Sequence, residues 1–446
     1  MHPIQKIITE YKSGKSTGIF SNCSANEYVL RAVMRRCTET GLPALIEATA
    51  NQVNQDGGYT GYTPKDFYDR CFKIAENEGF NTSKLILGGD HLGPLVWAKQ
   101  SEKEAMSKAE VLVSEYVSAG FTKIHIDTSM RLATDDPGKP LTDEIIAKRG
   151  AKLCAAAETA FKIKQKNNPN VLHPVYVIGS EVPTPGGATV KEEVKSGEPE
   201  TANRKHNNKE LDITSKDNCL ATIKAFKNAF NDYGLSSAWE RVIAIVVQPG
   251  VEFGEDEVHV YDSAKTKELC TVLKNDKLIF EGHSTDYQPC FALQNLVRDG
   301  IIILKVGPAL TFAFREALFA LENIEKISMQ GCGVKLSGFS DVLEQVMLKQ
   351  PGQWSGHYTG DEHKLKINRA YGFSDRARYY LPEPEVKAAI ERLVSNLNKP
   401  VAPTLLSQFM PLQYKRVREG TLENTVDELI LDKIGDYIDD YIYAVS

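Results

Sequence analysis

Short runs of apolar and β-branched residues alternate along the chain with longer segments in which apolar residues recur at helical spacing. Runs of about four to six such residues, bounded by glycine, proline or polar residues, are typical of buried strands. The pattern predicts eight strands, at residues 17–21, 43–48, 85–89, 123–126, 174–178, 242–247, 278–281 and 301–306.

Amphipathic segments fill most intervals between these strands and follow the 3.6-residue period of a helix. They lie at residues 64–79, 102–119, 142–165, 215–233, 263–274, 288–299 and 311–325. Strands that alternate with helices of this length indicate repeated βα units and a parallel sheet, and eight units favour closure into a (β/α)8 TIM barrel. An open, doubly wound sheet is the alternative fold.

The expected strands share a second property. Each delivers a hydrogen-bonding or charged side chain at or just beyond its C-terminal end, where barrel enzymes build their active sites. In chain order these positions are Ser21 with Asn22, Glu47 with Asn51, Asp90 with His91, Asp127, Glu181, Gln248, His283 and Lys305. This placement favours the barrel over the open sheet.

Two segments depart from the βα pattern. Residues 183–214 begin with a Pro-Thr-Pro-Gly-Gly run and continue rich in Lys, Glu and Asn, so they are either a lid or a surface insertion. From residue 327 the strand pattern stops, while helical patterns continue at 342–348, 384–398 and 423–443. We predict a barrel over residues 1–326 and a helical extension over 327–446, packed on the barrel or on a partner subunit.

Charge and composition exclude several classes of protein. A net charge of −6 and a pI near 5.9 give no basic field for nucleic acid. No segment approaches the roughly 18 apolar residues of a membrane helix, and the first residues lack a signal-peptide core, so we expect a cytoplasmic protein. The eight cysteines form no C-x-x-C pair and are expected to be reduced. Aromatic residues in the extension, such as Tyr379 and Tyr380, fit either a subunit interface or a buried core, and we expect a homo-oligomer.

Asp90 and His91 follow the third strand directly and are flanked by glycines. A carboxylate and an imidazole at a strand end suit a base and a metal ligand, although a simple cap would use the same residues. His283 follows the seventh strand, beside another glycine. In a closed barrel the third and seventh strands face each other across the mouth, so both imidazoles could bind one ion.

A catalytic zinc ion generally takes three protein ligands. Glu181 is the best additional ligand by charge, and Gln248 is the other available neighbour. The amide oxygen of Gln248 is a weaker donor, so this residue would otherwise orient substrate or form a backbone hydrogen bond before the Pro249-Gly250 turn.

Several polar positions near the mouth are candidate substrate contacts. The segments after the seventh and eighth strands often bind phosphate in barrels through backbone N–H groups, hydroxyls and a helix N-terminus, so a phosphorylated substrate fits but is not required. The candidate substrate-binding residues are Ser21, Asn51, Asn54, Ser284, Thr285, Asp286 and Lys305.

Motifs along nearly the whole chain closely resemble the Z-type subunit family of class II tagatose-1,6-bisphosphate aldolase. They are residues 51–61 (NQVNQDGGYTG), 88–94 (GGDHLGP), 123–127 (KIHID), 179–183 (GSEVP), 246–253 (VVQPGVEF), 282–288 (GHSTDYQ), 304–312 (LKVGPALTF) and 407–411 (SQFMP).

The resemblance implies two different roles. Members of the family are described as subunits that support a separate, catalytic Y-type aldolase subunit, whereas some relatives are described as metal-dependent ketose 4-epimerases. The Y-type aldolases bind zinc through three histidines. His91 and His283 are similar to that pattern, and Gln248 stands where the remaining histidine is expected.

The resemblance, together with the polar residues at the strand ends, implies a ketohexose 4-epimerase of the tagatose/fructose type, acting on a ketose or ketose phosphate by breaking and remaking the C3–C4 bond. Asp90, Asp127 or Glu181 would take the proton from the C4 hydroxyl. His91, His283, Glu181 and Gln248 would hold a divalent ion, expected to be Zn²⁺. The alternative is a noncatalytic partner of a Y-type aldolase subunit. Such a partner has no need for polar side chains at every strand end, where satisfying them costs stability.

Overall fold

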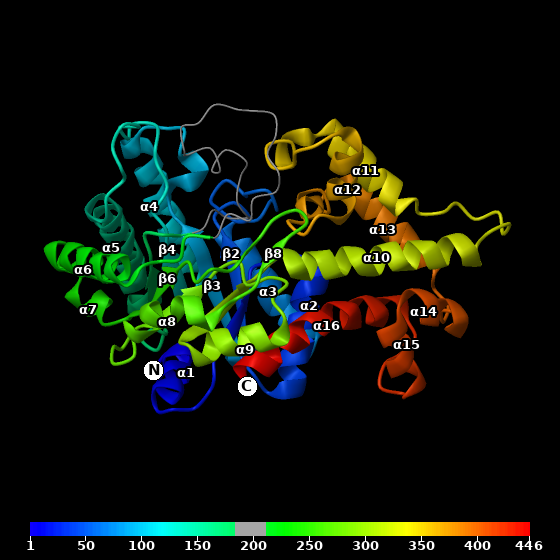
Figure 1. The fold of residues 1–446 in the computed structure, drawn as a ribbon, viewed down its shortest axis with the longest axis horizontal. Coiled ribbons are helices and arrows are strands. Elements are labelled where there is room, and N and C mark those ends of the chain that lie inside the picture. The colour runs from blue at the N-terminus through cyan, green and yellow to red at the C-terminus, as the bar shows by residue number, and fades with distance from the viewer. Residues whose placement is uncertain (183–210) are drawn as a thin grey trace.

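A closed barrel of eight parallel strands forms the centre of the molecule in the computed structural model, which describes residues 1–182 and 211–446 (Figure 1). Around the barrel the strands follow the order β1-β10-β9-β6-β5-β4-β3-β2. They are β1 (Ile19–Asn22), β2 (Ala44–Thr49), β3 (Leu85–Leu92), β4 (Lys123–Ile126), β5 (Val175–Ile178), β6 (Val242–Val247), β9 (Ile279–Gly282) and β10 (Ile301–Val306). The predicted TIM barrel is confirmed. A separate antiparallel pair, β7 (Glu252–Phe253) and β8 (Val258–His259), lies outside the barrel sheet.

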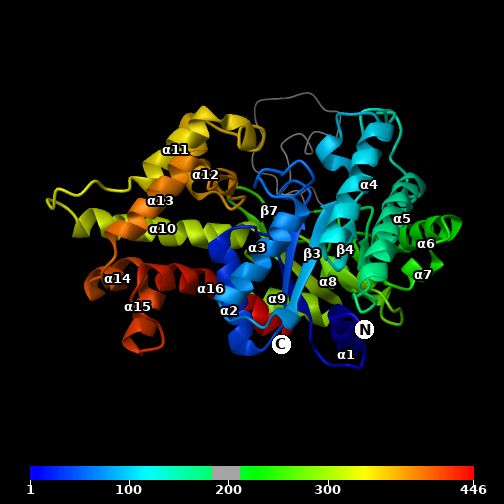
Figure 2. The ribbon, with the colours of Figure 1, turned by 180° about the vertical axis from the view of Figure 1, so that it is seen from behind.

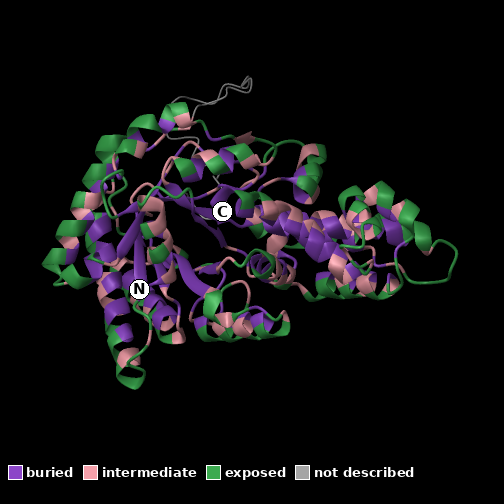
Figure 3. Cartoon of the chain, turned by 90° about the horizontal axis from the view of Figure 1, so that it is seen from below, coloured by how far each residue is buried: buried purple, intermediate pink, exposed green. Residues whose placement is uncertain are grey.

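The barrel strands are buried on both faces, which explains their near-continuous apolar sequences. All six residues of β6, which reads Val-Ile-Ala-Ile-Val-Val, are buried, as are all six of β10. A parallel strand of this kind is covered by helices outside and by other strands' side chains inside. Figure 3 shows the same arrangement, with buried strands at the centre and exposed residues on the outer faces of the helices.

Helices connect the strands and cover the barrel. They are α1 (Pro3–Lys12), α2 (Glu27–Thr40), α3 (Pro64–Asn77), α4 (Glu102–Ala119), α5 (Asp143–Asn167), α6 (Lys216–Asp232), α7 (Ser236–Trp239), α8 (Ser263–Thr271), α9 (Cys290–Arg298) and α10 (Pro308–Ser328). Side-chain caps define several starts: Thr63 with Asp66 forms a capping box at α3, and Ser101 with Glu104 forms one at α4.

The extension consists of helices and turns only, across residues 329–446, all of which are described. Its helices are α11 (Phe339–Lys349), α12 (Glu362–Tyr371), α13 (Pro384–Asn396), α14 (Pro403–Phe409), α15 (Pro411–Arg418) and α16 (Val426–Val445). Figures 1 and 2 show α10 running outward from the barrel, with α11 to α13 on one side of it and α14 to α16 on the other. The proposed division after residue 326 stays a prediction, and α10 crosses it without a break.

The last helix returns to the barrel. α16 packs against α2, α9 and α10. The carbonyl oxygen of Val445 accepts a hydrogen bond from the backbone N–H of Gly18 at 3.1 Å and another from the Thr17 hydroxyl at 3.2 Å, so this end of the chain is bonded to the approach to β1.

The predicted lid or insertion at 183–214 falls outside the described residues except for its last four positions. Within the described part of the chain, no helix combines the length and apolar character needed to cross a bilayer.

Candidate active site

An irregularity in β3 turns two consecutive side chains toward the barrel mouth. Gly89 pairs with Ile124 of β4 and Leu92 pairs with Ile126, so two residues of β3, Asp90 and His91, stand opposite one residue of β4. An extra residue of this kind re-aims side chains that would otherwise alternate between faces. His91 adopts a left-handed φ of 47°, and both side chains are buried. Backbone strain of this kind in non-glycine residues occurs most often at functional sites.

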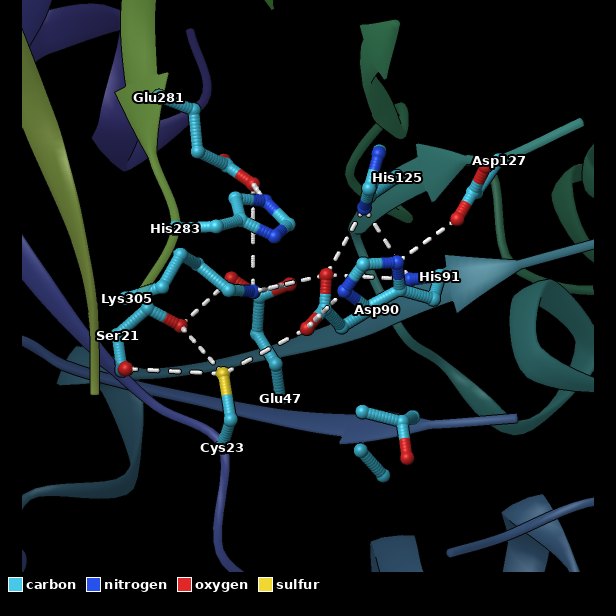
Figure 4. Close-up of polar contacts among 12 residues, drawn as sticks. Ser21, Cys23, Glu47, Asp90, His91, His125, Asp127, Glu281, His283 and Lys305 are labelled. Atoms are coloured by element: carbon cyan, nitrogen blue, oxygen red, sulfur yellow. Dashed lines mark hydrogen bonds and ion pairs between the residues drawn. The ribbon is translucent and has the colours of Figure 1, made fainter. Parts of the chain in front are cut away.

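Three imidazoles and one carboxylate meet at this point (Figure 4). Asp90, His91, His125 and His283 each offer one ligand atom, and these atoms lie within 4.8 Å of one another. The ring centroids of His91 and His283 are 4.9 Å apart, and each is 5.1 Å from that of His125. The structure therefore brings His91 and His283 together across the barrel, with His125 of β4 beside them.

Each of the three histidines contacts a carboxylate. Nδ1 of His91 lies 2.8 Å from Asp127 Oδ2, Nδ1 of His125 lies 2.8 Å from Asp90 Oδ1, and Nε2 of His283 lies 3.0 Å from Glu281 Oε1. A carboxylate behind an imidazole fixes the orientation of the ring and is the usual support for a metal-binding histidine.

Two lysines and two glutamates lie inside the barrel next to the histidines. Lys123 Nζ is 2.7 Å from Glu47 Oε1 and 2.6 Å from Glu281 Oε2, with all three side chains fully buried. Lys305 Nζ is 3.0 Å from Glu47 Oε2 and 3.1 Å from Asp90 Oδ1. Ser21 donates a 2.6 Å hydrogen bond to Glu47 Oε1. Opposite charges in contact offset the large cost of burying each one alone.

This charge arrangement sets the protonation of the cluster. Burial opposes ionisation of Asp90, but His91 and Lys305 outweigh it and hold the pKa of this carboxyl well below its usual range. Burial lowers the pKa of His283 to about 4. Burial also acts against the charged form of His91, yet Asp90 and Asp127 raise the pKa of His91 above its ordinary value. At neutral pH, Asp90 is therefore ionised and His283 is a neutral imidazole.

The donor set fits a divalent ion. The buried Nε2 of His125 has no hydrogen-bond partner in the described part of the chain, although a buried polar atom is normally paired. Imidazole nitrogens with a carboxylate oxygen are the ligands of catalytic zinc and of related transition metals. A divalent ion bound by these atoms would give Nε2 of His125 a partner.

A cavity of about 660 Å³ opens on the cluster. Asp90, His91, His283 and Lys305 line it on the barrel side. On the other side it is lined by residues of the extension, among them Arg378 and Tyr379. This volume is in the range of cavities that hold small organic ligands.

Glu181 and Gln248, expected as ligands, lie outside the cluster. Glu181 Oε1 accepts a 2.7 Å hydrogen bond from Asn218 of α6. The side-chain oxygen of Gln248 accepts hydrogen bonds from the N–H groups of Gly250 and Val251, at 2.8 and 3.1 Å. Gln248 thus forms the turn contact that the sequence offered as its alternative role.

The expected substrate contacts divide into two groups. Asn51, Ser284, Asp286 and Lys305 line the cavity. The others make contacts within the protein: Ser21 binds Glu47, the Thr285 hydroxyl donates to the carbonyl of Lys305 at 2.7 Å, and Asn54 bonds its own loop at Ala50, Asp56 and Gly58.

Sequence reasoning passed over His125, although the signal was present. β4 reads Lys-Ile-His-Ile, and this alternation places Lys123 and His125 on one face and the two isoleucines on the other. Polar residues within a buried strand point into the barrel as effectively as those beyond its end.

Comparison with known proteins identifies the family. The family described as D-tagatose-1,6-bisphosphate aldolase subunit GatZ/KbaZ-like matches residues 4–446. This chain belongs to that family. The kinship inferred from the motifs is confirmed.

Three solved structures are similar to this chain to different degrees. A probable tagatose 6 phosphate kinase from Sinorhizobium meliloti 1021 is 39% identical, with a TM-score of 0.83 over 96% of this chain and 100% of that one. The YdjI aldolase from Escherichia coli K12 is 11% identical, with a TM-score of 0.40 over 85% of this chain and 95% of that one. A fructose-bisphosphate aldolase from Campylobacter jejuni is 13% identical, with a TM-score of 0.39 over 88% and 91%. Similarity as low as that to the two aldolases carries no argument about the site.

Proposed function

We propose that this chain is a divalent-metal-dependent ketohexose 4-epimerase of the tagatose/fructose type. The observation that carries the proposal is the buried group of Asp90, His91, His125 and His283, with a carboxylate behind each imidazole and a cavity in front. Epimerisation at C4 through cleavage of the C3–C4 bond needs no redox cofactor. It needs a base for the C4 hydroxyl and positive charge near the carbonyl.

Three histidines form the proposed ligand set: His91, His125 and His283. Asp127, Asp90 and Glu281 would orient them. In this proposal His125 replaces Glu181 and Gln248, both predicted as ligands from the sequence, because their side chains are hydrogen-bonded elsewhere. A bound divalent ion, with Zn²⁺ the expected one, would supply a Lewis acid for the carbonyl and the adjacent hydroxyl of the ketose.

Asp90 is the proposed base. Its carboxylate is ionised and lines the cavity, whereas neither Asp127 nor Glu181 is among the lining residues. Asp90 would take the proton from the C4 hydroxyl as the C3–C4 bond breaks, leaving an aldehyde and a three-carbon enediolate. After the aldehyde turns its other face, the bond reforms and Asp90 returns the proton to the new C4 oxygen. The ammonium of Lys305, 3.1 Å from Asp90, would stabilise the negative charge that develops on the C4 oxygen as its proton leaves.

A noncatalytic role remains the second candidate, because the family is described as an aldolase subunit. In that role the chain would stabilise or activate a separate Y-type aldolase. The two roles predict different behaviour of the purified chain alone.

The deciding experiment combines metal analysis with turnover. The purified chain, loaded with Zn²⁺, Mn²⁺ or Co²⁺ in turn, is incubated with tagatose, fructose and their 6-phosphates. We expect interconversion by the chain alone, abolished by chelator and reduced about 100-fold or more in His125→Ala. His363→Ala, an exposed histidine on α12, is the matched control and should behave as wild type. A metal-free chain that converts no ketose but raises the activity of a Y-type aldolase would support the second role instead.

A further inference from the structure

We infer that Arg378 of the extension recognises a phosphate group on the substrate, so that the substrate class is ketose 6-phosphates in preference to free ketoses. This inference rests on the proposed function, and it names the substrate of the same site. Arg378 lies in the 3₁₀ turn Arg376–Tyr379 and lines the cavity that also contains Asp90, His91 and His283.

The segments in which a barrel usually binds phosphate are already engaged here. Asp286 Oδ1 accepts hydrogen bonds from the N–H groups of Gly307 and Ala309, at 3.0 and 2.8 Å, and so caps the N-terminus of α10. A carboxylate at that position satisfies the helix end that would otherwise attract an anion. Lys305 is paired with Glu47 and Asp90. A phosphate therefore needs a different cation in the cavity.

Arg378 differs from these residues in the groups that its side chain contacts. Its guanidinium donates to the carbonyl oxygens of Ser374 and Asp375 and, at 2.9 Å, to the hydroxyl of Tyr379, all of them uncharged groups. Across residues 1–182 and 211–446 it forms no ion pair with a carboxylate. Two other arginines that line the cavity are neutralised by carboxylates: Arg31 by Glu78 and Asp427, and Arg70 by Glu27.

The guanidinium is also held in place. The backbone of Asp375 has a left-handed φ of 45°, and its carboxylate binds the Thr311 hydroxyl at 2.6 Å and Arg315 Nε at 2.9 Å, both on α10. The guanidinium carbon of Arg378 lies 4.4 Å from the ring centroid of Tyr379. A planar guanidinium fixed in this way can bind phosphate oxygens with little loss of side-chain entropy.

Tyr59, a residue of the barrel domain, lines the cavity next to Arg378 and Tyr379. Its ring packs edge-on against that of Tyr379, with the centroids 4.9 Å apart. Tyr59 lies in the loop between β2 and α3, so barrel and extension residues meet beside Arg378. The cavity thus offers a metal-binding end for the carbonyl and, on the extension side, an arginine that forms no ion pair with a described carboxylate and could bind a phosphate.

Calorimetric titration tests the inference. The metal-loaded full chain is titrated with tagatose 6-phosphate, fructose 6-phosphate and the two free ketoses. Arg378→Gln should weaken binding of the 6-phosphates about tenfold or more and change binding of the free ketoses less than about twofold. Arg378→Lys, which keeps the charge but not the planar fork, should give an intermediate loss. Arg392→Gln, on α13 and outside the cavity lining, controls for the change itself.

Lys387→Gln removes the exposed lysine that also lines the cavity. The inference is overturned if Lys387→Gln carries the phosphate-specific loss, if Arg378→Gln weakens both classes of ketose equally, or if the wild-type chain binds only free ketoses. Thermal unfolding of each variant shows whether the fold is intact, and Arg378→Lys decides the matter if Arg378→Gln unfolds. Phosphate-specific binding through Arg378 without any turnover would refute the epimerase and leave this inference standing.

Discussion

Nδ1 of His91, on β3, lies 2.8 Å from Oδ2 of Asp127, which directly follows β4, and both side chains are buried. The contact joins adjacent strands at the point where β3 carries its extra residue. It also leaves the other ring nitrogen of His91 to face the cluster. Asp127 is therefore a positioning residue for the proposed metal ligand.

Asp127→Asn should weaken metal binding by about 10- to 100-fold, because the amide keeps the shape of the carboxylate but loses its charge. Competition with a chromogenic chelator measures the affinity, and thermal unfolding of the metal-free protein shows whether the variant still folds. Asp341→Asn, at an exposed position of α11, is the control. Unchanged metal affinity in Asp127→Asn would show that this carboxylate does not support a ligand.

Lys123 should contribute strongly to the stability of the folded state. Its ammonium lies between Glu47 and Glu281 with no exposure, so Lys123→Met leaves these two buried carboxylates with the ammonium of Lys305 alone. We expect a loss of about 3–5 kcal/mol in the free energy of unfolding, measured by urea titration. Lys366→Met, at an exposed position of α12, should cost less than about 0.5 kcal/mol. Similar values for the two variants would contradict this account of the barrel interior.

Asp286 should make stability depend on pH. Burial raises its pKa to about 6, against the effect of the Ala309 and Gly307 N–H groups, from an ordinary value of 3.8. Between pH 3.8 and about pH 6 the folded state binds more protons than the unfolded state. The contribution of Asp286 to stability therefore falls as the pH rises through about 6.

Asp286→Asn keeps an oxygen to accept both N–H groups but cannot ionise. Relative to wild type, its free energy of unfolding should therefore improve from pH 4 to pH 7, by up to about 3 kcal/mol. Asp286→Ala, which leaves both donors unpaired, should be destabilised by about 2–4 kcal/mol. A difference between Asp286→Asn and wild type that stays constant with pH would refute the titration of this carboxyl.

Gly93 is required by the close approach of β3 to Asp127. A Cβ at this position would lie 1.6 Å from the carbonyl oxygen of Asp127, so Gly93→Ala must push the strands apart. We expect a loss of at least about 2 kcal/mol in stability and weaker metal binding, since Asp127 would move away from His91. Gly352→Ala, where a Cβ meets nothing within 4 Å, should be neutral. Normal stability and metal affinity in Gly93→Ala would contradict the close packing.

Local sequence pattern was sufficient for the barrel because its strands are buried on both faces. The apolar runs at 242–247 and 301–306 coincide with β6 and β10 from end to end. β3 extends three residues beyond the predicted end at residue 89, because the bulge keeps Asp90 and His91 in the strand. Hydrophobic periodicity carries no signal for a bulge of this kind.

The site was harder to predict, for two physical reasons. Polar residues inside strands, such as His125 and Glu281, resemble interruptions of an apolar run unless the direction of each side chain is known. Arg378 lines the cavity because the extension folds back over the barrel mouth. That position depends on the contacts of Asp375 with α10 and not on local sequence. Residues just past strand ends, such as Asp90 and His283, were accessible because the barrel topology alone places them.

The return of α16 to the barrel has a consequence for biosynthesis. A ribosome releases the first strand and α2 long before the helix that covers them, so the approach to β1 lacks the carbonyl of Val445 and α2 lacks part of its packing until α16 has been synthesised. The barrel of a nascent chain is therefore incompletely covered until α16 emerges, and the apolar face of α2 is exposed during that interval.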